Sequence, residues 1–302
     1  MATVTTGSHP KQLWPGVKKF FGATYAEKPL VCDIVFDEYS SNKAYEEYVE
    51  ETGMGLAPQK TEGSAVSYDT DAQGYVSRLT NTTYGLGAKV TQEAIEDNQY
   101  FSVARRKAGK LARSMRQTKE NVFANILNRG FTAAYAGGDG KELLATDHPT
   151  LSGDQSNELA VAADLSEASL EDLLTQIRQA KDSRGLRIQL KGQKLVVPPE
   201  LEFEATRIIS SVNQSGTANN DINAMRELGM LPGGVVVWDY LTDADAFFVK
   251  TDASEGLIRQ QRRALAMTQD NDFDTDNACM KATERYAGGW ADWRGIYGSP
   301  GA

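Results

Sequence analysis

The sequence predicts an α+β protein of at least two lobes, and three observations lead to that prediction. Residues 97–130 have the periodicity of one long amphipathic helix. The polar stretch before them, residues 63–92, alternates with the period of a β-ribbon. After Leu143, short strand-like and helix-like segments alternate, which is typical of mixed domains. The chain of 302 residues is long enough for two lobes, at about 150 residues per domain.

The first thirty residues are expected to form an extended arm with one short amphipathic turn. Pro10, Pro15 and Pro29 interrupt regular structure in this stretch. An arm with exposed aromatic side chains usually needs a partner surface, so Trp14 and the pair Phe20 and Phe21 are candidates for contact with another copy.

Residues 37–51 carry six acids, including Glu46 and Glu47, against the single base Lys43. Such a run is interpreted as the solvated face of a helix.

Residues 63–92 are expected to form a long β-hairpin with its turn at residues 71–74. Apolar side chains alternate on both sides of that turn, for example Val66 and Tyr68 before it and Tyr84 and Leu86 after it. Most other side chains in the stretch are small or polar. Isolated hairpins are marginal in water, so this ribbon is expected to become ordered only against something else, most simply a neighbouring copy.

A helix is predicted from about Asp97 to Arg129, closed by Gly130. Its length is about 50 Å at about 1.5 Å per residue. One apolar stripe runs along it through Phe101, Ala104, Ala108, Leu111, Met115, Val122 and Ile126. Beside the stripe lie seven bases: Arg105, Arg106, Lys107, Lys110, Arg113, Arg116 and Lys119. They either pair with the acids of residues 37–51, which is the favoured interpretation, or face nucleic acid.

The second half predicts a helix capped by Ser166 that ends before Gly185, followed by two short strands over residues 186–190 and 194–197. A helix around Phe203, a polar loop over residues 213–221, and buried strands at 235–238 and 247–249 follow.

Four large aromatic side chains lie close to the last residue: Tyr286, Trp290, Trp293 and Tyr297. Each offers about 150–250 Å² to bury, so they are expected to anchor the C-terminal segment in a core.

Composition excludes several classes of function. The net charge of −9 gives no general footprint for nucleic acid. Cys32 and Cys279 lie far apart, which disfavours a disulfide framework or a zinc site. No apolar run of about 18 residues occurs, so no membrane partner is expected.

Motifs that would carry catalysis or bind a cofactor are incomplete. GGDGKE at 137–142 lacks the first glycine and the Ser or Thr of a phosphate loop. The alternating acids from Asp270 to Asp276 lack the glycine and final glutamate of a calcium loop. His148, beside Asp147 and near Ser152, has no nucleophile elbow to complete a triad. No catalytic residue, cofactor or metal is therefore expected, and the enzyme hypothesis is disfavoured.

Several segments, in this order, resemble the major capsid proteins of tailed bacteriophages with the Hong Kong 97 fold, and look particularly like the Mu-like prophage major head subunits. They are the arm, the polar ribbon, the basic helix, LLATDHPTLSG, LVVPPELEFEATRIISS, FFVKTDASEGLIRQQRRAL and RYAGGWADWRGIYGSPGA. The resemblance covers the chain from about residue 30.

The resemblance implies a shell subunit with six parts. These are an N-terminal arm (1–36), the start of a peripheral domain (37–62), an extended loop (63–92), a spine helix with more of the peripheral domain (93–149), an axial domain (150–250) and C-terminal peripheral strands (251–302). Contacts between copies are expected from the arm, acidic stretch, ribbon and helix at Trp14, Phe20, Phe21, Glu46, Glu47, Tyr68, Tyr75, Arg78, Tyr84, Leu86, Arg105, Arg106 and Arg113.

The implied function is a shell of hexamers and pentamers around double-stranded DNA, with non-specific contacts to that DNA. Implied partners are a portal, a separate scaffold protein and a decoration protein, and the implied location is the virion after assembly in the host cytoplasm. No long charged segment precedes residue 30, which is why a separate scaffold is expected. Two alternatives stay open: an encapsulin-type compartment that encloses protein cargo, and a monomeric α+β enzyme.

Overall fold

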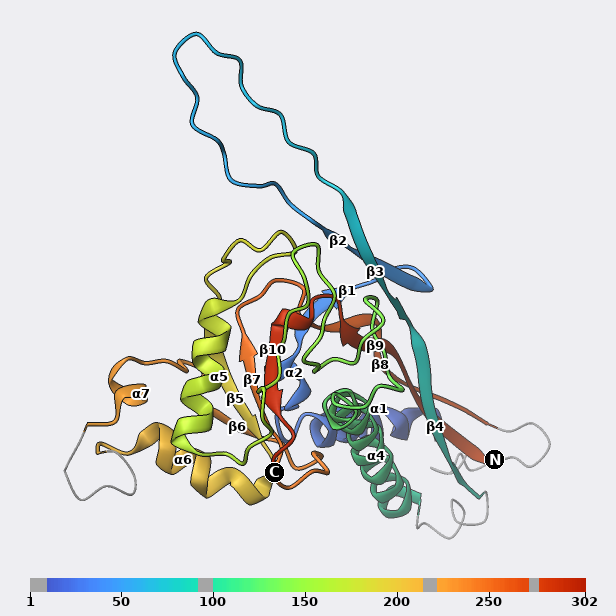
Figure 1. Ribbon diagram of the computed structural model, residues 1–302. Helices are drawn as coiled ribbons and strands as arrows, with labels where there is room; N and C mark the ends of the chain where they lie inside the picture. The colour runs from blue at the N-terminus through green and yellow to red at the C-terminus, as the bar shows by residue number, and fades with distance from the viewer. Residues whose placement is uncertain (1–9, 92–99, 214–221, 272–276) are drawn as a thin grey trace, which may run out of the picture.

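A computed structural model of the chain describes residues 10–91, 100–213, 222–271 and 277–302. Two lobes lie side by side, and a long loop reaches far beyond them (Figure 1). Residues 214–221 of the predicted polar loop and most of the alternating acids at 270–276 lie outside the described residues, as do the side chains of Trp14 and Phe101.

The first lobe is built on a four-stranded sheet in the order β1-β8-β9-β4. The strands are β1 (Asp37–Ser40), β8 (Leu257–Asn271), β9 (Ala278–Trp290) and β4 (Thr82–Val90). β1 runs parallel to β8, and the other neighbours are antiparallel. Helix α4 (Tyr100–Asn128) packs against β4 and β9, and α1 (Pro10–Tyr25) packs on α4.

Helix α4 confirms the predicted spine helix to within a few residues at each end. It ends where predicted, and the Gly130 amide donates to the Leu127 carbonyl. Its buried stripe begins as expected with Ala104, Ala108, Leu111 and Met115. Beyond Met115 the buried stripe shifts to Phe123, Ala124 and Leu127, while the predicted Val122 and Ile126 are only partly buried.

The second lobe contains a four-stranded sheet in the order β10-β7-β5-β6. Its strands are β5 (Gly192–Val197), β6 (Val235–Val237), β7 (Phe247–Thr251) and β10 (Ile296–Ser299). The α-helices of the described part of this lobe are α5 (Glu167–Gln179), α6 (Glu202–Ser210) and α7 (Ala224–Glu227). The Ser166 side chain accepts from the Ser169 amide, which confirms the predicted cap of α5.

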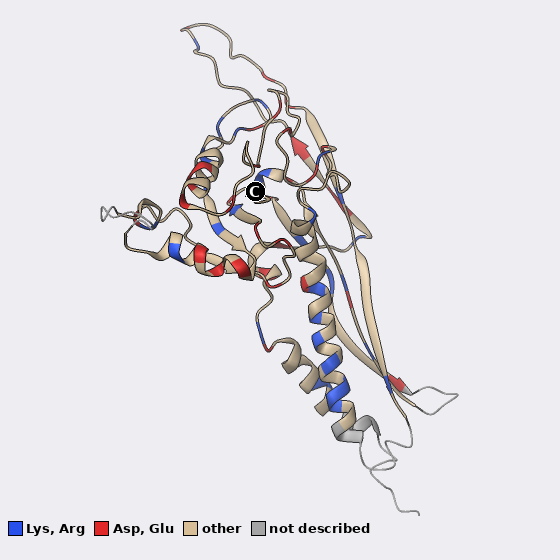
Figure 2. Cartoon of the chain, turned by 60° about the horizontal axis from the view of Figure 1, so that its bottom comes forward, with Lys and Arg blue, Asp and Glu red and all other residues tan. Residues whose placement is uncertain are grey.

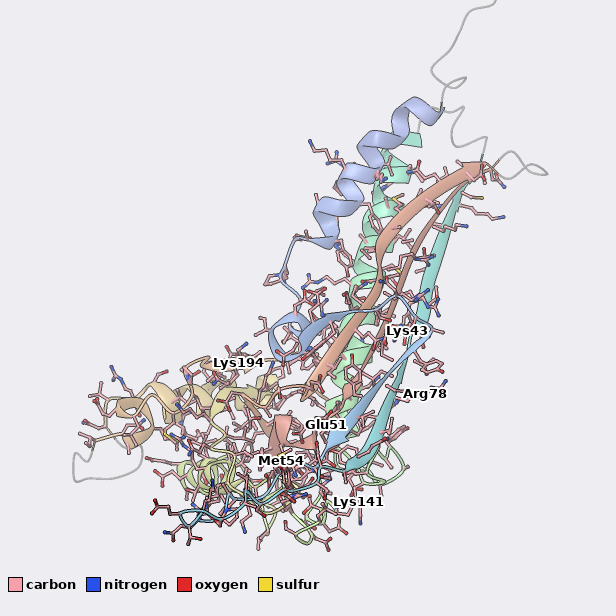
Figure 3. All side chains as sticks on the ribbon, turned by 90° about the horizontal axis from the view of Figure 1, so that it is seen from above. Lys43, Glu51, Met54, Arg78, Lys141 and Lys194 are labelled. Carbon is pink, nitrogen blue, oxygen red and sulfur yellow. The ribbon has the colours of Figure 1, made fainter. Side chains whose placement is uncertain are left out.

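The two lobes are connected by the chain between β9 and β10 and by several polar contacts. β10 follows β9 of the first sheet but pairs antiparallel with β7 of the second, so the C-terminal strands do not all stay in the first lobe. At the junction seen in Figure 3, Lys194 Nζ donates to the Ile34 carbonyl at 2.8 Å. Lys250 Nζ lies 2.7 Å from Asp37 Oδ1. The four-residue helix α2 (Cys32–Val35) contains Ile34 and ends two residues before Asp37, so it lies at the same junction.

The prediction of an extended arm is wrong for residues 10–25, which form helix α1. Val17 and Phe21 lie four residues apart on one face and are buried against α4. The arm's aromatic stripe is therefore used within the subunit, because α4 offers it an apolar surface. Gly109 in α4 makes the approach close, since a β-carbon there would lie 3.0 Å from the Phe20 ring.

The helix predicted over the acidic stretch is also wrong. Residues 37–40 form β1, and residues 45–51 form β2 (Tyr45–Glu51). Exposure alternates along β2, which pairs antiparallel with β3 (Gln73–Thr80). Strand pairing overrides the helix preference of the glutamates, because propensity is a weak prior against tertiary contacts.

The predicted hairpin exists in a shifted position. Its strands are β2 and β3, and the connecting loop is residues 52–72, hereafter the extended loop. The predicted turn at 71–74 instead contains the start of β3, and β4 belongs to the first sheet. The strand predicted at 186–190 is wrong as well, since only an isolated bridge between Lys181 and Arg187 forms there.

Candidate assembly surfaces

His148 lies in a buried polar cluster that links distant loops. Its Nδ1 lies 2.6 Å from Asp139 Oδ2 and its Nε2 lies 3.1 Å from Asn157 Oδ1. Both ring nitrogens therefore lie within hydrogen-bonding distance of side-chain oxygens. The ring is fully buried and stacks on Trp293 at 4.3 Å. His148 thus holds loops together and presents no ring atom to a substrate.

Asn157 completes the cluster and fixes the orientation of its own amide. Its Nδ2 donates to the carbonyls of Leu143, Trp293 and Ile296. Its Oδ1 accepts from the Ala145 amide at 3.0 Å. The cluster therefore ties the predicted LLATDHPTLSG segment to the turn that precedes β10.

The GGDGKE loop also makes a contact within the subunit. Lys141 of the GGDGKE loop pairs with Asp147, the neighbour of His148. Among the described residues no group of three His, Cys, Asp or Glu could hold a metal ion. The described helices include none long and apolar enough to cross a membrane.

The C-terminal aromatics are packed as predicted. Tyr286, Trp293 and Tyr297 are buried, and Trp290 is partly buried. Tyr286 stacks between Tyr84 and Phe123 at 4.7 and 5.6 Å. Burial raises the pKa of the Tyr286 hydroxyl. These rings fix the first sheet against α4.

Two glycines of the sequence GGW make this packing feasible. A β-carbon at Gly288 would lie 2.5 Å from the Phe123 ring, and one at Gly289 would lie 2.4 Å from Leu79. Glycine at position 288 allows the sheet to lie close to α4, and glycine at position 289 allows it to lie close to β3.

Glu120 is a buried carboxylate of α4 at the junction of the lobes. Oε1 accepts from the Val31 amide at 2.6 Å, and Oε2 accepts from Trp238 Nε1 at 2.9 Å and from the Cys32 amide at 3.3 Å. Desolvation raises its pKa, although these donors oppose the shift. The side chain connects the segment after α1, the spine helix and the second lobe.

The extended loop is fixed at its root and unsupported at its tip. Thr52 and Ala72 are joined by backbone hydrogen bonding, and Asp69 accepts from the Gly55 amide at 2.7 Å. Arg184 of the second lobe lies 2.6 Å from Asp69. Hydrogen bonds from the Gly55 and Thr70 amides lower the pKa of Asp69. Figure 3 shows Met54 just beyond Glu51, where β2 passes into the loop.

The extended loop exposes large apolar side chains. Exposed fractions are 81% for Leu56 and 95% for Tyr68, and Met54 and Val66 are also exposed. A monomeric protein rarely presents such a group of apolar side chains to water. The loop therefore has the properties of a surface that another chain covers.

A basic surface runs along α1 and α4. The exposed bases are Lys18 and Lys19 on α1, and Arg105, Arg106, Lys110 and Arg113 on α4. Figure 2 shows the basic bands along α4. Arg113 lies 3.8 Å from Glu27, an exposed pair that is worth little. Lys119, the last of the seven predicted bases, is different: it is buried in an ion pair with Glu284 at 2.7 Å.

The acids of residues 37–51 pair mainly with bases outside the spine helix. Glu38 contacts Arg259 at 2.8 Å, Glu46 contacts Lys43 at 3.1 Å, and Glu47 contacts Arg78 at 3.8 Å. Within the parts of the chain that are described, no ion pair joins this stretch to the spine helix. Pairing with the helix of another copy stays a prediction.

The candidate contact residues separate into two groups. Phe21 is buried, Tyr84 stacks on Tyr286, and Phe20 lies under Arg105 at 4.3 Å, so these side chains contribute to packing within the subunit. A second group keeps at least part of its surface open to another chain: Glu46, Glu47, Tyr68, Tyr75, Arg78, Leu86, Arg105, Arg106 and Arg113. Glu46, which bonds Ser41 and Lys43, and Tyr75 are only partly exposed.

Sequence reasoning missed Glu120 and Asn157. A glutamate within a helix of seven bases looks like an ordinary surface residue, and its three donors lie 88, 89 and 118 positions away. One signal was present in the sequence. Glu120, which follows Lys119, lies three residues before Phe123 and therefore on the same apolar face of the helix, where a charge needs a partner.

Comparison with known proteins defines the class. A family model described as phage capsid protein matches residues 75–299. No curated protein matches the chain. A virus-like particle from Pyrococcus furiosus matches with a TM-score of 0.55 and 11% identity over 95% of this chain and 98% of that one.

Two further solved structures are similar. The capsid of a native GTA particle matches with a TM-score of 0.56 and 14% identity over 89% of each chain. The capsid of bacteriophage JBD30 decorated with minor capsid protein trimers matches with a TM-score of 0.55 and 16% identity over 71% of this chain and 92% of that one.

The fold, with its spine helix, two sheets and extended loop, is that of a capsid shell subunit of the Hong Kong 97 type. The family match covers well over half of the sequence. The chain belongs to the phage capsid protein family.

Proposed function

We propose that this chain is the major head subunit of a tailed phage, and that copies of it assemble into the hexamers and pentamers of an icosahedral shell around double-stranded DNA. The first lobe would be the peripheral domain and the second lobe the axial domain. The family match and the Hong Kong 97 type of fold support the proposal.

The extended loop is the observation that carries this proposal. Twenty-one residues project from the body, and their apolar side chains have little of the subunit to pack against. Ordering each residue costs about 1–2 kcal/mol of backbone entropy, which exposed side chains do not offset. A neighbouring copy would supply the missing contacts.

Hydrogen exchange tests this proposal most directly. We expect residues 52–72 to exchange fast in a dilute subunit and at least about tenfold more slowly in assembled particles, while α4 is protected in both. Negative-stain microscopy of the same samples should show shells or rings. Uniform small particles at every concentration, with an equally protected loop in the dilute subunit, would contradict it.

Contact with packaged DNA is proposed for the basic surface of α1 and α4. The net charge of −9 limits such contact to this local patch, so DNA would not be held tightly to the whole wall. A portal, a separate scaffold protein and assembly in the host cytoplasm are proposed from the family alone. The JBD30 capsid with its minor capsid protein trimers supports a decoration partner.

The alternative shell, an encapsulin-type compartment, is not favoured, because the family model that matches is that of phage capsid protein. The contents of purified particles distinguish the two. A phage head produced with its packaging partners contains nuclease-protected DNA, whereas a compartment contains a stoichiometric protein cargo.

A further inference from the structure

A groove on the second lobe lies between α5 and the turn after α7. Its apolar residues are Leu174, Met225, Leu228 and Met230, and its volume is about 430 Å³. A smaller hollow of about 320 Å³ continues past Leu174 and Leu228 toward Gly192 and Pro232. Leu228 is 72% exposed, so one wall of the groove is an uncovered apolar side chain.

The rim of the groove is basic. Arg178, Arg187 and Lys191 line it and are exposed, and Glu171 is the acid among the lining residues. None of the three bases makes an ion pair with another described residue. Such a rim suits a partner that brings acids beside an apolar group.

An apolar side chain of the right kind projects from another face of the same lobe. Phe203, in the first turn of α6, is 73% exposed. Exposed acids flank it: Glu200 precedes α6 and Glu202 begins it. Figure 1 shows α6 along the bottom of the second lobe, whereas α5 and α7 lie toward its outer side. Neither hollow is lined by residues 200–203, so the two surfaces belong to one subunit and share no residue.

We propose that Phe203 of one subunit inserts into the α5–α7 groove of the next, with Glu200 and Glu202 facing Arg178 and Lys191. The inference rests on the proposed function and names the contact by which copies join. Two different patches meet, so the contact is heterologous, and repetition about an axis closes a ring. A benzyl side chain in an apolar pocket with a charged rim has the composition of an interface hot spot.

Disulfide trapping tests the contact. In a Cys279→Ser background, which leaves only the buried Cys32, the double variant Phe203→Cys, Leu228→Cys is assembled and oxidised. We expect a ladder of covalent multimers on a non-reducing gel, ending at the ring size, because each subunit offers both halves of the contact. Each single-cysteine variant should stay monomeric. Val161→Cys with Leu228→Cys is the matched control, since Val161 is exposed but lies outside both surfaces.

Charge reversal gives an independent test. Glu202→Lys and Arg178→Glu should each reduce shell yield about tenfold at equal protein concentration, and the double variant should recover most of that loss. Circular dichroism should show unchanged folding, because all these side chains are exposed.

The outcomes separate the contact from the proposed function. Shells without a ladder, together with single reversals that assemble normally, would overturn the Phe203 contact and leave the shell function standing. If the unaltered protein forms no shells under any condition, the proposed function itself fails.

Discussion

At the scale of single residues, Glu120 shows how one side chain joins three parts of the chain. It accepts from the Val31 and Cys32 amides and from the Trp238 indole, all in a buried setting. Leaving a buried donor without its acceptor costs about 1–3 kcal/mol.

The variant Glu120→Gln is therefore expected to lower the free energy of unfolding by about 1–3 kcal/mol. A glutamine amide nitrogen would face the Val31 amide in one orientation, and both the Cys32 amide and the Trp238 indole in the other. Urea unfolding of the isolated subunit, followed by tryptophan fluorescence, measures the change. Glu62→Gln, at an exposed position of the extended loop, should leave the midpoint unchanged. Equal midpoints for the two variants would contradict this role of Glu120.

Gly288 provides a second prediction at this scale. Gly288→Ala places a methyl group 2.5 Å from Phe123, and overpacking of this kind costs about 1–3 kcal/mol. Gly22→Ala is the matched control. A β-carbon placed at Gly22 would meet no atom within 4 Å beyond its own helix backbone and chain neighbours, and alanine favours the helix α1. The melting temperature should fall for Gly288→Ala, and it should stay unchanged or rise for Gly22→Ala. A neutral Gly288→Ala would show that the sheet and α4 can separate without cost.

At the scale of elements, the sequence allows prediction wherever a pattern is long or is closed by a cap. The stripe of α4 from Ala104 to Met115 and the Ser166 cap of α5 are local signals, and both are confirmed. β2 could not be predicted, because its glutamates favour helix and its strand exists only through pairing with β3. For the same reason α1 was predicted as an arm: its stripe is short, and the surface that completes it lies on α4.

The candidate surfaces follow the same division. Exposed positions such as Tyr68 and Leu86 could be expected from a polar ribbon with few apolar groups. Tyr84 was predicted as a contact residue for the same reason, but the long-range pairing of β4 with β9 places it on Tyr286. Periodicity shows which side chains share a face, and tertiary pairing determines what covers that face.

The root of the extended loop should depend on pH through Asp69. Its pKa is lower in the folded chain, so the stabilisation is present above the ordinary aspartate range, about pH 4, and is lost as pH falls through the folded value. Hydrogen exchange at Gly55 and Thr70 in assembled particles, corrected for the intrinsic rate, should accelerate as the pH falls below about 4. Asp69→Asn should remove the pH dependence, and an unchanged profile in that variant would assign it to another group.

At the scale of the whole molecule, charge is distributed unevenly. The chain carries a net charge of −9, yet exposed bases gather on the surface formed by α1 and α4. Such an arrangement favours weak, local and salt-sensitive contact with a polyanion.

Binding of the subunit to a 30-base-pair duplex tests this distribution, with the duplex length chosen as about three helical turns. The double variant Arg106→Gln, Lys110→Gln should make the slope of the log binding constant against log salt concentration less steep. The expected change is about 0.9 per lost phosphate contact, or about 2 in total. Lys281→Gln is the control. Met280 is buried on the side of α4, and successive side chains of a strand point to opposite faces, so the exposed Lys281 lies on the face away from α4. Equal slopes for both variants would exclude this surface as the DNA contact.

The position of β10 has a consequence for synthesis on the ribosome. Its partner strand β7 is translated about 45 residues before β10, which is an interval of roughly 2–9 s at about 5–20 residues per second. During that interval the nascent chain presents a bare edge of Phe247, Phe248 and Val249. Crowded polysomes that make a shell protein in quantity would bring many such edges together, so rapid closure by β10, or a chaperone that shields β7, protects the subunit from aggregating before it can assemble.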